Sequence, residues 1–328
     1  MKTSVVILNF NGRNFLEKFL PSVVLFLGNA QIVVADNGST DDSVPFLRKN
    51  YPEIHLILLE KNYGFAEGYN LALKNLDAQY YVLLNSDVEV TENWLSTLEN
   101  FMDKHPDVVA CQPKIRSYLN PEKFEYAGAC GGLIDGYGYP FCRGRILNKV
   151  EADNGQYNDV AEIFWASGAC LFIRADEYWQ AGGLDGRFFA HQEEIDLCWR
   201  LKARGKSIVC IPKSVVFHVG GGALNYENPR KTFLNFRNNF LLLYKNLPAK
   251  KLFKVFIIRF LLDYAAFLQM IFQRKFKNAI EIPKARIAFY KMRKNFTQDR
   301  AKNLALTVNF FPKGMIKGLI FFKKMKIL

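Results

Sequence analysis

Acidic residues stand at two points of this sequence where an apolar run ends. Asp87 follows YYVLL in the stretch NSDVE, and Asp36 follows QIVVA in the stretch DNGSTDD. A carboxylate at the end of a buried strand is a suitable hard ligand for Mg²⁺ or Mn²⁺ that carries a substrate diphosphate. Asp87 is therefore a candidate metal ligand, and Asp36 is a candidate acceptor for a base or ribose. The alternatives are a helix cap at Asp87 or Glu89 and a plain Asp-Asn-Gly turn at Asp36.

Two further sites carry groups that titrate or bind ligands. Glu193, Glu194 and Asp196 form an acidic cluster at the start of an expected helix. The helix dipole stabilises carboxylates there, whereas crowding raises one of their pKa values, which suits a general base. The alternative is charge complementarity at a helix end without chemistry. His218 follows an apolar strand and precedes three glycines, so it is either a ligand-binding histidine or a structural one.

These residues need a scaffold that brings the ends of several strands together. The first 115 residues alternate apolar runs with helical patterns, which is typical of βαβ units and a mostly parallel sheet. Ligands bind beyond the carboxyl ends of such strands. Strands are predicted at 4–10, 31–36, 55–59, 80–85 and 108–112, and helices at 13–27, 42–50, 66–76 and 92–103.

Several other classes of site are excluded or disfavoured. No G-x-G-x-x-G occurs, and Arg200 stands where a Walker A motif ending at Gly205-Lys206-Ser207 needs its first glycine. Phosphate must therefore be bound by other means, such as a divalent metal. The six cysteines show no C-x-x-C pair, which favours reduced core cysteines in a cytosolic setting. The start, MKTSVVILNFNG, lacks the features of a signal peptide and is predicted as a buried strand.

Charge divides the chain of 328 residues near residue 228. The net charge of +13 combines a balance of −7 over residues 1–228 with +20 over residues 229–328. Residues 116–160 are predicted as a long irregular connection. Residues 232–246 and 251–272 show apolar, aromatic helical patterns with interspersed Lys and Arg.

The second of these helical patterns is long enough to span a bilayer. Lys254, Arg259 and Asp263 lie within it, which favours a helix in the membrane interface with basic side chains reaching the head groups. We predict a catalytic domain at 1–228 and a basic, amphipathic, membrane-associating extension at 229–328. Its expected partner is an anionic membrane surface rather than nucleic acid.

In their order along the chain, these motifs resemble the family 2 glycosyltransferases with the GT-A fold, an α/β architecture. The resemblance covers residues 3–225 and is closest to the bacterial branch of rhamnosyltransferases and other O-antigen or cell-wall sugar transferases. The matching stretches are VVILNFNGRNFL, VVADNGSTDDS, NYGFAEGYN, YYVLLNSDVEV, SGACLFIR, GGLDGRFFAHQEEIDLCWRLKARG and VVFHVGGG.

The resemblance implies the chemistry and the cellular setting of the protein. A sugar moves from a nucleotide-diphosphate donor, UDP- or dTDP-linked, to a hydroxyl of a glycan or lipid-linked acceptor, with inversion and with Mg²⁺ or Mn²⁺ as cofactor. The expected location is the cytoplasmic face of the membrane. Positions that match the donor-binding motifs are Asn9, Asn11, Asp36, Asn62, Gly64, Gly68, Asn70, Asn85 and Ser86.

The resemblance also assigns the reacting groups. Asp87 matches the last aspartate of the D-x-D metal motif, which reads Asn-Ser-Asp here, and His218 matches a histidine that contacts the metal or the diphosphate. The family's E-D motif places the base at Glu194, after Glu193, where Asp is usual; Asp196 is the competing base. Trp165, before Ser167-Gly168, is either a stacking platform for a sugar or a core residue.

Three other functions compete with this interpretation. A sugar-nucleotidyltransferase uses a similar sheet, but its glycine-rich, lysine-bearing signature is missing after the first strand. A basic scaffold that binds membranes or nucleic acid would explain the charge of residues 229–328, although no nucleic-acid-binding signature accompanies it. A catalytically dead relative is disfavoured by the retention of Asp36, Asp87, Glu193 and His218.

Overall fold

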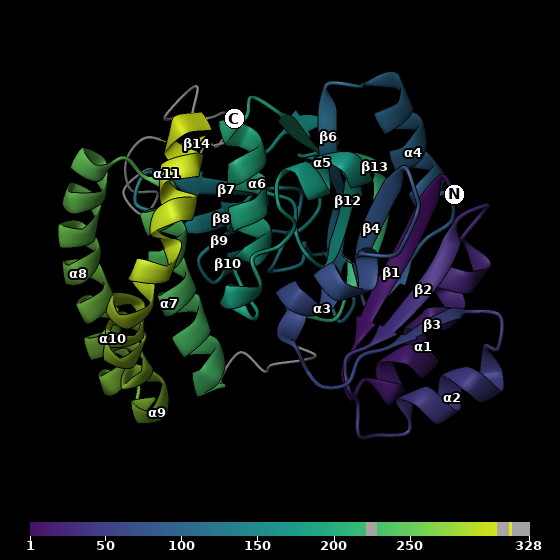
Figure 1. The fold of residues 1–328 in the computed structure, drawn as a ribbon, viewed down its shortest axis with the longest axis horizontal. Helices are drawn as coiled ribbons and strands as arrows, with labels where there is room; N and C mark the ends of the chain where they lie inside the picture. The colour runs from purple at the N-terminus through teal and green to yellow at the C-terminus, as the bar shows by residue number, and fades with distance from the viewer. Residues whose placement is uncertain (221–227, 307–314, 317–328) are drawn as a thin grey trace.

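A mixed, mostly parallel sheet of nine strands forms the centre of the molecule (Figure 1). The computed structural model describes residues 1–220, 228–306 and 315–316. The strand order is β11-β13-β6-β12-β4-β1-β2-β3, and β5 pairs with β13. The strands are β1 (Thr3–Asn9), β2 (Gln31–Asp36), β3 (His55–Leu58), β4 (Tyr80–Asn85), β5 (Val88–Val90), β6 (Val108–Ser117), β11 (Ala161–Glu162), β12 (Cys170–Arg174) and β13 (Ser207–His218). The predicted α/β fold class is confirmed.

Two hydrophobic clusters lie on the two faces of this sheet. Successive residues of β1 alternate between them, since Val5 and Ile7 belong to one cluster and Val6 to the other. All six cysteines are free and buried, as predicted. The helices in this part of the chain are α1 (Arg13–Leu25), α2 (Ser43–Asn50), α3 (Gly64–Leu73), α4 (Trp94–Lys104), α5 (Ala175–Gln180), the 3-10 helix η1 (Gly186–Phe188) and α6 (Glu193–Ala203).

The connection at 116–160 is more regular than predicted. It contributes four strands to a small second sheet, in the order β10-β9-β8-β7-β14. Strands of two to four residues are too short to show an alternating pattern, which is why the sequence did not reveal them. They are β7 (Gly132–Asp135), β8 (Pro140–Cys142), β9 (Arg145–Ile146), β10 (Lys149–Val150) and β14 (Met315–Ile316).

Helices gather at the end of the molecule far from β1–β3, and α8 lies outermost (Figure 1). They are α7 (Pro229–Asn246), α8 (Ala249–Phe272), α9 (Phe276–Ala279), α10 (Glu281–Met292), the 3-10 helix η2 (Arg293–Phe296) and α11 (Thr297–Leu306). Both expected helical patterns are therefore helices, although the first begins at Pro229.

The helix α7 shares the core of the sheet domain. Phe240 and Leu243 belong to the same hydrophobic cluster as Val6 of β1. The division into domains at 1–228 and 229–328 remains a prediction. The packing shows that α7 contributes to the hydrophobic core of residues 1–228. The basic stretch at 317–328 and the glycines at 221 and 222 lie outside the described residues.

One expectation about α8 is wrong. Arg259 does not reach outward to head groups; it is 2% exposed and pairs with Asp263 at 3.1 Å. Its guanidinium also donates to the Tyr137 carbonyl at 3.1 Å. The charge is paired because the helix turns this side to the protein, where an isolated charge is costly.

Candidate active site

The carboxyl ends of β1 and β2 bring Asn9 and Asp36 together, since the two residues are directly paired in the sheet register. The amide of Asn9 donates to Asp36 at 2.9 Å and lies 3.2 Å from the hydroxyl of Ser39. The other oxygen of Asp36 accepts the Ser39 N–H at 2.9 Å. The Asp36 carboxylate is thus held in one orientation at the predicted ligand edge.

Asn11 completes this corner. Its backbone is left-handed, with φ of 49°, and its side chain oxygen accepts the Thr40 N–H at 2.7 Å. Its own N–H donates to Ser39 at 2.9 Å. A Cβ on Gly12 would come within 2.5 Å of the Asn9 side chain and 3.6 Å of the Ser86 hydroxyl, so Ser86 borders the same corner.

Asn37 connects this corner to α3. Its amide donates to the Gly64 carbonyl at 3.0 Å and to Asn62 at 3.2 Å. Gly64 has φ of +81°, and a Cβ there would meet Phe189 at 2.6 Å. A Cβ on Gly68 would approach Leu8 at 2.9 Å and the Asn37 amide at 3.1 Å. Both glycines let α3 pack closely beneath the strand ends.

A second cluster forms around His218 at the end of β13. Its Nε2 lies 3.1 Å from Asp87 Oδ1 and 3.4 Å from the Asn85 amide. Its Nδ1 lies 3.5 Å from Glu125 Oε1. Asp87, Glu125 and His218 are all buried. Although burial opposes the charged imidazolium, Asp87 and Glu125 raise the pKa of His218 to about 10.

Asp87 and His218 fit a divalent metal as part of its coordination shell. Within residues 1–220, 228–306 and 315–316, no group of three or more His, Cys, Asp or Glu side chains is arranged to hold a metal alone. Mg²⁺ usually takes only one or two carboxylates and completes its shell with substrate phosphates and water. Asp87 Oδ1 and His218 Nε2 lie 3.1 Å apart, so with the imidazole deprotonated they can supply one oxygen and one nitrogen of such a shell.

Glu193 and Glu194 lie at the start of α6, near the loop before β12. Burial raises the pKa of Glu194 to about 7. Burial, and next the charge of Glu194, raise the pKa of Glu193 well above its usual value. A Cβ on Gly168 would lie 4.0 Å from the Glu194 Cβ, and the neighbouring Ala169 carbonyl accepts the Asn85 N–H at 3.0 Å. Gly168, Ala169 and Asn85 therefore connect Glu194 to the Asp87–His218 cluster through neighbouring contacts.

The surroundings of Asp196 argue against its role as the competing base. It is fully buried, and its carboxylate accepts from Arg200 at 2.9 Å and from Lys245 at 2.8 Å. These cations lower the pKa of Asp196 although burial opposes ionisation. A carboxylate engaged in two ion pairs inside the protein is unsuited to take a proton from a substrate.

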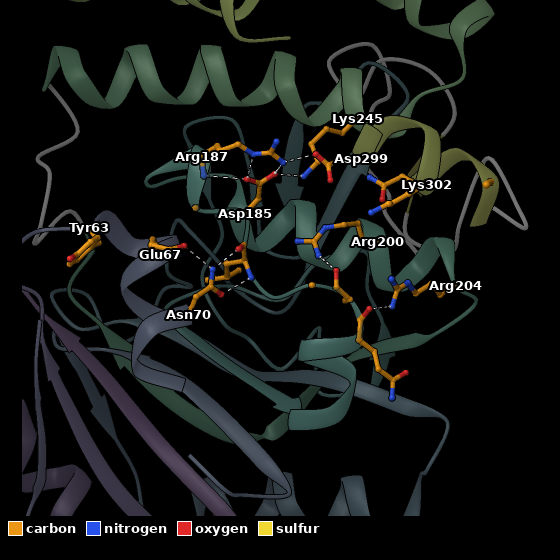
Figure 2. Close-up of a pocket in the computed structure, with 17 residues that line it drawn as sticks. Tyr63, Glu67, Asn70, Asp185, Arg187, Arg200, Arg204, Lys245, Asp299 and Lys302 are labelled. Atoms are coloured by element: carbon orange, nitrogen blue, oxygen red, sulfur yellow. Dashed lines mark hydrogen bonds and ion pairs between the residues drawn. The ribbon is translucent and has the colours of Figure 1, made fainter. Parts of the chain in front are cut away.

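A charged pocket of about 940 Å³ opens on the side of α6 that carries Arg200 (Figure 2). Asn70 lies there rather than at the strand ends that hold Asp36. Its amide donates to the Leu184 carbonyl at 2.7 Å, and its oxygen accepts from Tyr178 at 2.7 Å. Asn70 thus ties α3 to the loop before η1, and its expected contact with the donor has no support in this geometry.

Trp165 is a core residue and not a stacking platform. It is 3% exposed, and its indole N–H donates to the Leu133 carbonyl at 2.9 Å. A Cβ on Gly132 would come within 2.1 Å of the indole ring. The Gly132 backbone lies against the ring and the residue is 3% exposed, so the ring presents no face to a sugar.

Replacing Trp165 by phenylalanine should lower the free energy of unfolding and leave the KM for donor and acceptor unchanged. The loss of the buried hydrogen bond to Leu133 costs about 1 kcal/mol, since a buried carbonyl loses its partner. Urea unfolding and steady-state kinetics measure the two effects. Trp179→Phe, at a more exposed tryptophan, is the matched control. A raised acceptor KM with unchanged stability would restore the stacking role.

Three residues of this site were not given a binding role of their own from the sequence. Asn37 and Ser39 stand beside Asp36 in the same turn, and their position after a strand was a usable signal. Glu125 had none, because it lies in the connection at 116–160, where no pattern marks it. Only the pairing of β6 with β13 places this segment beside His218.

The chain is similar in sequence to known glycosyltransferases. Residues 4–158 match the sequence family described as glycosyl transferase family 2. The chain is 27% identical over 233 residues to the N-acetylglucosaminyl-diphospho-decaprenol L-rhamnosyltransferase of Mycobacterium tuberculosis, covering 65% of this chain and 75% of the relative. It is 22% identical to the dTDP-rhamnosyl transferase RfbF of Shigella flexneri, covering 66% and 72%.

A solved structure shares the fold over nearly the whole chain. The mannosyltransferase PcManGT from Pyrobaculum calidifontis, in complex with GDP-Man and Mn²⁺, superposes with a TM-score of 0.53 over 94% of this chain and 86% of its own. The identity is 14%, so this likeness shows the fold alone.

The fold and the site together define a glycosyltransferase of the GT-A type, an enzyme that uses a nucleotide sugar. Residues 4–158 match glycosyl transferase family 2, and the chain is similar to bacterial rhamnosyltransferases.

Proposed function

We propose that this enzyme transfers a sugar, with inversion, from a UDP- or dTDP-linked donor to a hydroxyl of a lipid-linked or glycan acceptor in the synthesis of a surface polysaccharide. One observation carries the proposal: Asp36 and the Asp87–His218 cluster lie at the same edge of the sheet, and Glu194 of α6 packs beside Gly168 next to that edge. Hydrogen bonds connect Asp36 to Asn9 and Asn85 to both His218 and Ala169.

The donor lies along this edge in the proposed complex. Asp36 accepts a hydrogen bond from the base or ribose, and Asn9 with Ser39 holds that carboxylate in place. Asp87 and His218 would hold a divalent metal, which would supply positive charge beside the departing diphosphate. Relatives that transfer rhamnose make dTDP-rhamnose the first donor to test.

Glu194 is the proposed general base. Its carboxylate takes the proton from the acceptor hydroxyl, whose oxygen attacks the anomeric carbon from the face opposite the diphosphate. The bond from that carbon to the diphosphate oxygen breaks, and the electron pair leaves with the nucleotide diphosphate. One displacement inverts the configuration.

A donor screen tests the proposal directly. The purified full chain is incubated with UDP-, GDP- and dTDP-sugars, with Mn²⁺ or Mg²⁺, and with a short-chain polyprenyl diphosphate sugar as acceptor. Release of UDP or dTDP, and a product of inverted anomeric configuration by NMR, are the expected results. A retained configuration, or nucleotide release from GDP-sugars alone, would overturn the proposal.

Asp87→Asn should weaken Mn²⁺-dependent binding of the nucleotide diphosphate by about tenfold or more, because it removes one negative charge from the metal shell. Calorimetric titration of dTDP or UDP with and without Mn²⁺ measures this effect without turnover. Asp107→Asn, at an exposed aspartate, is the control. Equal affinity of Asp87→Asn and wild type in Mn²⁺ would remove Asp87 from the metal site.

The acceptor is placed at the cytoplasmic face of a membrane in this proposal. The basic character of residues 229–328, which carry +20, supports it. The enzyme itself stays peripheral, because its charges favour head groups over the hydrocarbon interior.

A further inference from the structure

The outer face of α8 is a large apolar surface without a partner in the described structure. We use "the α8 outer face" for six exposed residues spaced by one, three, four or seven along the helix, so that they form one stripe. They are Phe253, Ile257, Phe260, Leu261, Leu268 and Phe272. Phe253 is 73% exposed and Phe272 is 85% exposed. A monomeric soluble protein rarely leaves such a contiguous stripe in water.

No exposed charge interrupts this stripe over residues 255–273. Arg259 and Asp263 are the only charged residues in that stretch, and both face the protein. Arg259 is bonded to the Tyr137 carbonyl and to Asn239, while Asp263 also accepts from Tyr139 at 3.3 Å and from Arg286 at 3.4 Å. This network fixes which side of α8 faces outward.

Basic residues stand at both ends of the stripe. Lys250, Lys251 and Lys254 precede or begin it, and Arg274, Lys275 and Lys277 follow it; all six are exposed. Between residues 249 and 280, the buried Asp263 is the only acidic residue. Basic side chains at both ends of the helix can reach negative head groups while the apolar stripe between them contacts the hydrocarbon just below.

We propose that the α8 outer face inserts into the head-group boundary of an anionic bilayer, with the helix in the plane of the membrane. By length and composition, α8 is the one helix of the described chain apolar enough to cross a membrane. Crossing would pull Arg259 and Asp263 from their partners into hydrocarbon, at about 2.5–3.5 kcal/mol for each charge. Lying in the plane keeps that network intact and buries the stripe.

Charge argues against a second copy of the chain as the occupant. Two α8 outer faces in contact would bring the basic ends of both helices together, and residues 229–328 carry only three acidic residues to compensate them. Asp263 is buried in its ion pair, and Asp299 lies 2.7 Å from Arg187. Like-charge contacts of this kind disfavour association.

This inference specifies the membrane contact of the proposed function, and its test is independent of catalysis. The full chain is floated on a density gradient with neutral phosphatidylcholine vesicles and with vesicles containing 30% phosphatidylglycerol. The test variant is Leu261→Glu/Leu268→Glu. The control is Leu25→Glu/Leu119→Glu, which makes the same change at two exposed leucines on α1 and on the loop after β6.

Wild type and control should float with the anionic vesicles, and the test variant should bind at least tenfold more weakly. Raising the salt to 0.5 M should weaken wild-type binding, because the basic ends contribute. Donor hydrolysis in vesicle-free buffer should be equal in all three proteins, so a failed donor screen leaves this result untouched. Equal flotation of the test variant, or a wild type that forms dimers through α8 and ignores vesicles, would overturn the inference.

Discussion

Glu194→Gln should reduce kcat by about 10²–10⁴, the usual contribution of a positioned general base, with little change in the KM for the donor. The amide keeps the size of the side chain but cannot take the acceptor proton. Burial raises the pKa of Glu194 to about 7, so the base is protonated and inactive in acid. The wild-type rate should therefore rise with pH and reach a plateau above about 8, whereas the residual rate of the variant should lack that acidic limb.

Two further variants make this result specific. Glu53→Gln, at an exposed glutamate before β3, should leave both the rate and its pH profile unchanged. Glu193→Gln separates the two neighbouring carboxyls. If Glu194→Gln kept the wild-type profile and Glu193→Gln lost it, the base would be Glu193.

Lys245→Met should lower the free energy of unfolding by about 3–5 kcal/mol, the cost of leaving buried charge uncompensated. Lys245 is 2% exposed, and its ammonium lies 2.7 Å from Asp185 (Figure 2) and 2.8 Å from Asp196. Despite their burial, these two carboxyls have lowered pKa values, because Lys245 and neighbouring arginines favour the charged form. Urea unfolding at pH 7 measures the loss.

The pH dependence of stability gives a second check on this network. A carboxyl whose pKa is lowered by folding contributes stability that is present above its unfolded pKa and is lost as the pH falls through the folded value. Wild type should therefore lose stability in acid more steeply than Lys245→Met. Lys74→Met, at an exposed lysine after α3, is the control. A loss below 1 kcal/mol in Lys245→Met would mean that water reaches the two aspartates.

The strand ends were predictable because two signals coincide there. A buried parallel strand is a continuous apolar run, and the first polar residue after it lies on the ligand side of the sheet. Asn9 and Asp36 satisfy both conditions, Asp87 follows its strand two residues after Asn85, and the structure brings Asn9 and Asp36 into direct contact. Local pattern and global topology agree at these positions, so one sequence sufficed to find them.

The residues that the sequence left open or unmarked depend on distant parts of the chain. Glu125 reaches His218 only through the pairing of β6 with β13. Trp165 enters the core because Gly132 admits its ring, a contact across 33 residues. Asp196 differs from Glu194 because α7 supplies Lys245, 49 residues further along the chain. Side-chain periodicity carries no information about such partners.

The contact between α7 and the loop before α6 limits where the C-terminal region of this enzyme can be replaced. The amide of Asn238 lies 2.7–3.0 Å from the carbonyls of Phe188, Ala190 and His191, just before Glu193. A hybrid enzyme that takes its C-terminal region from a relative should therefore be joined after Asn246 rather than near residue 228. In terms of the proposed function, the outer helices can change with the membrane they contact, whereas α7 has to change together with the residues that precede Glu193.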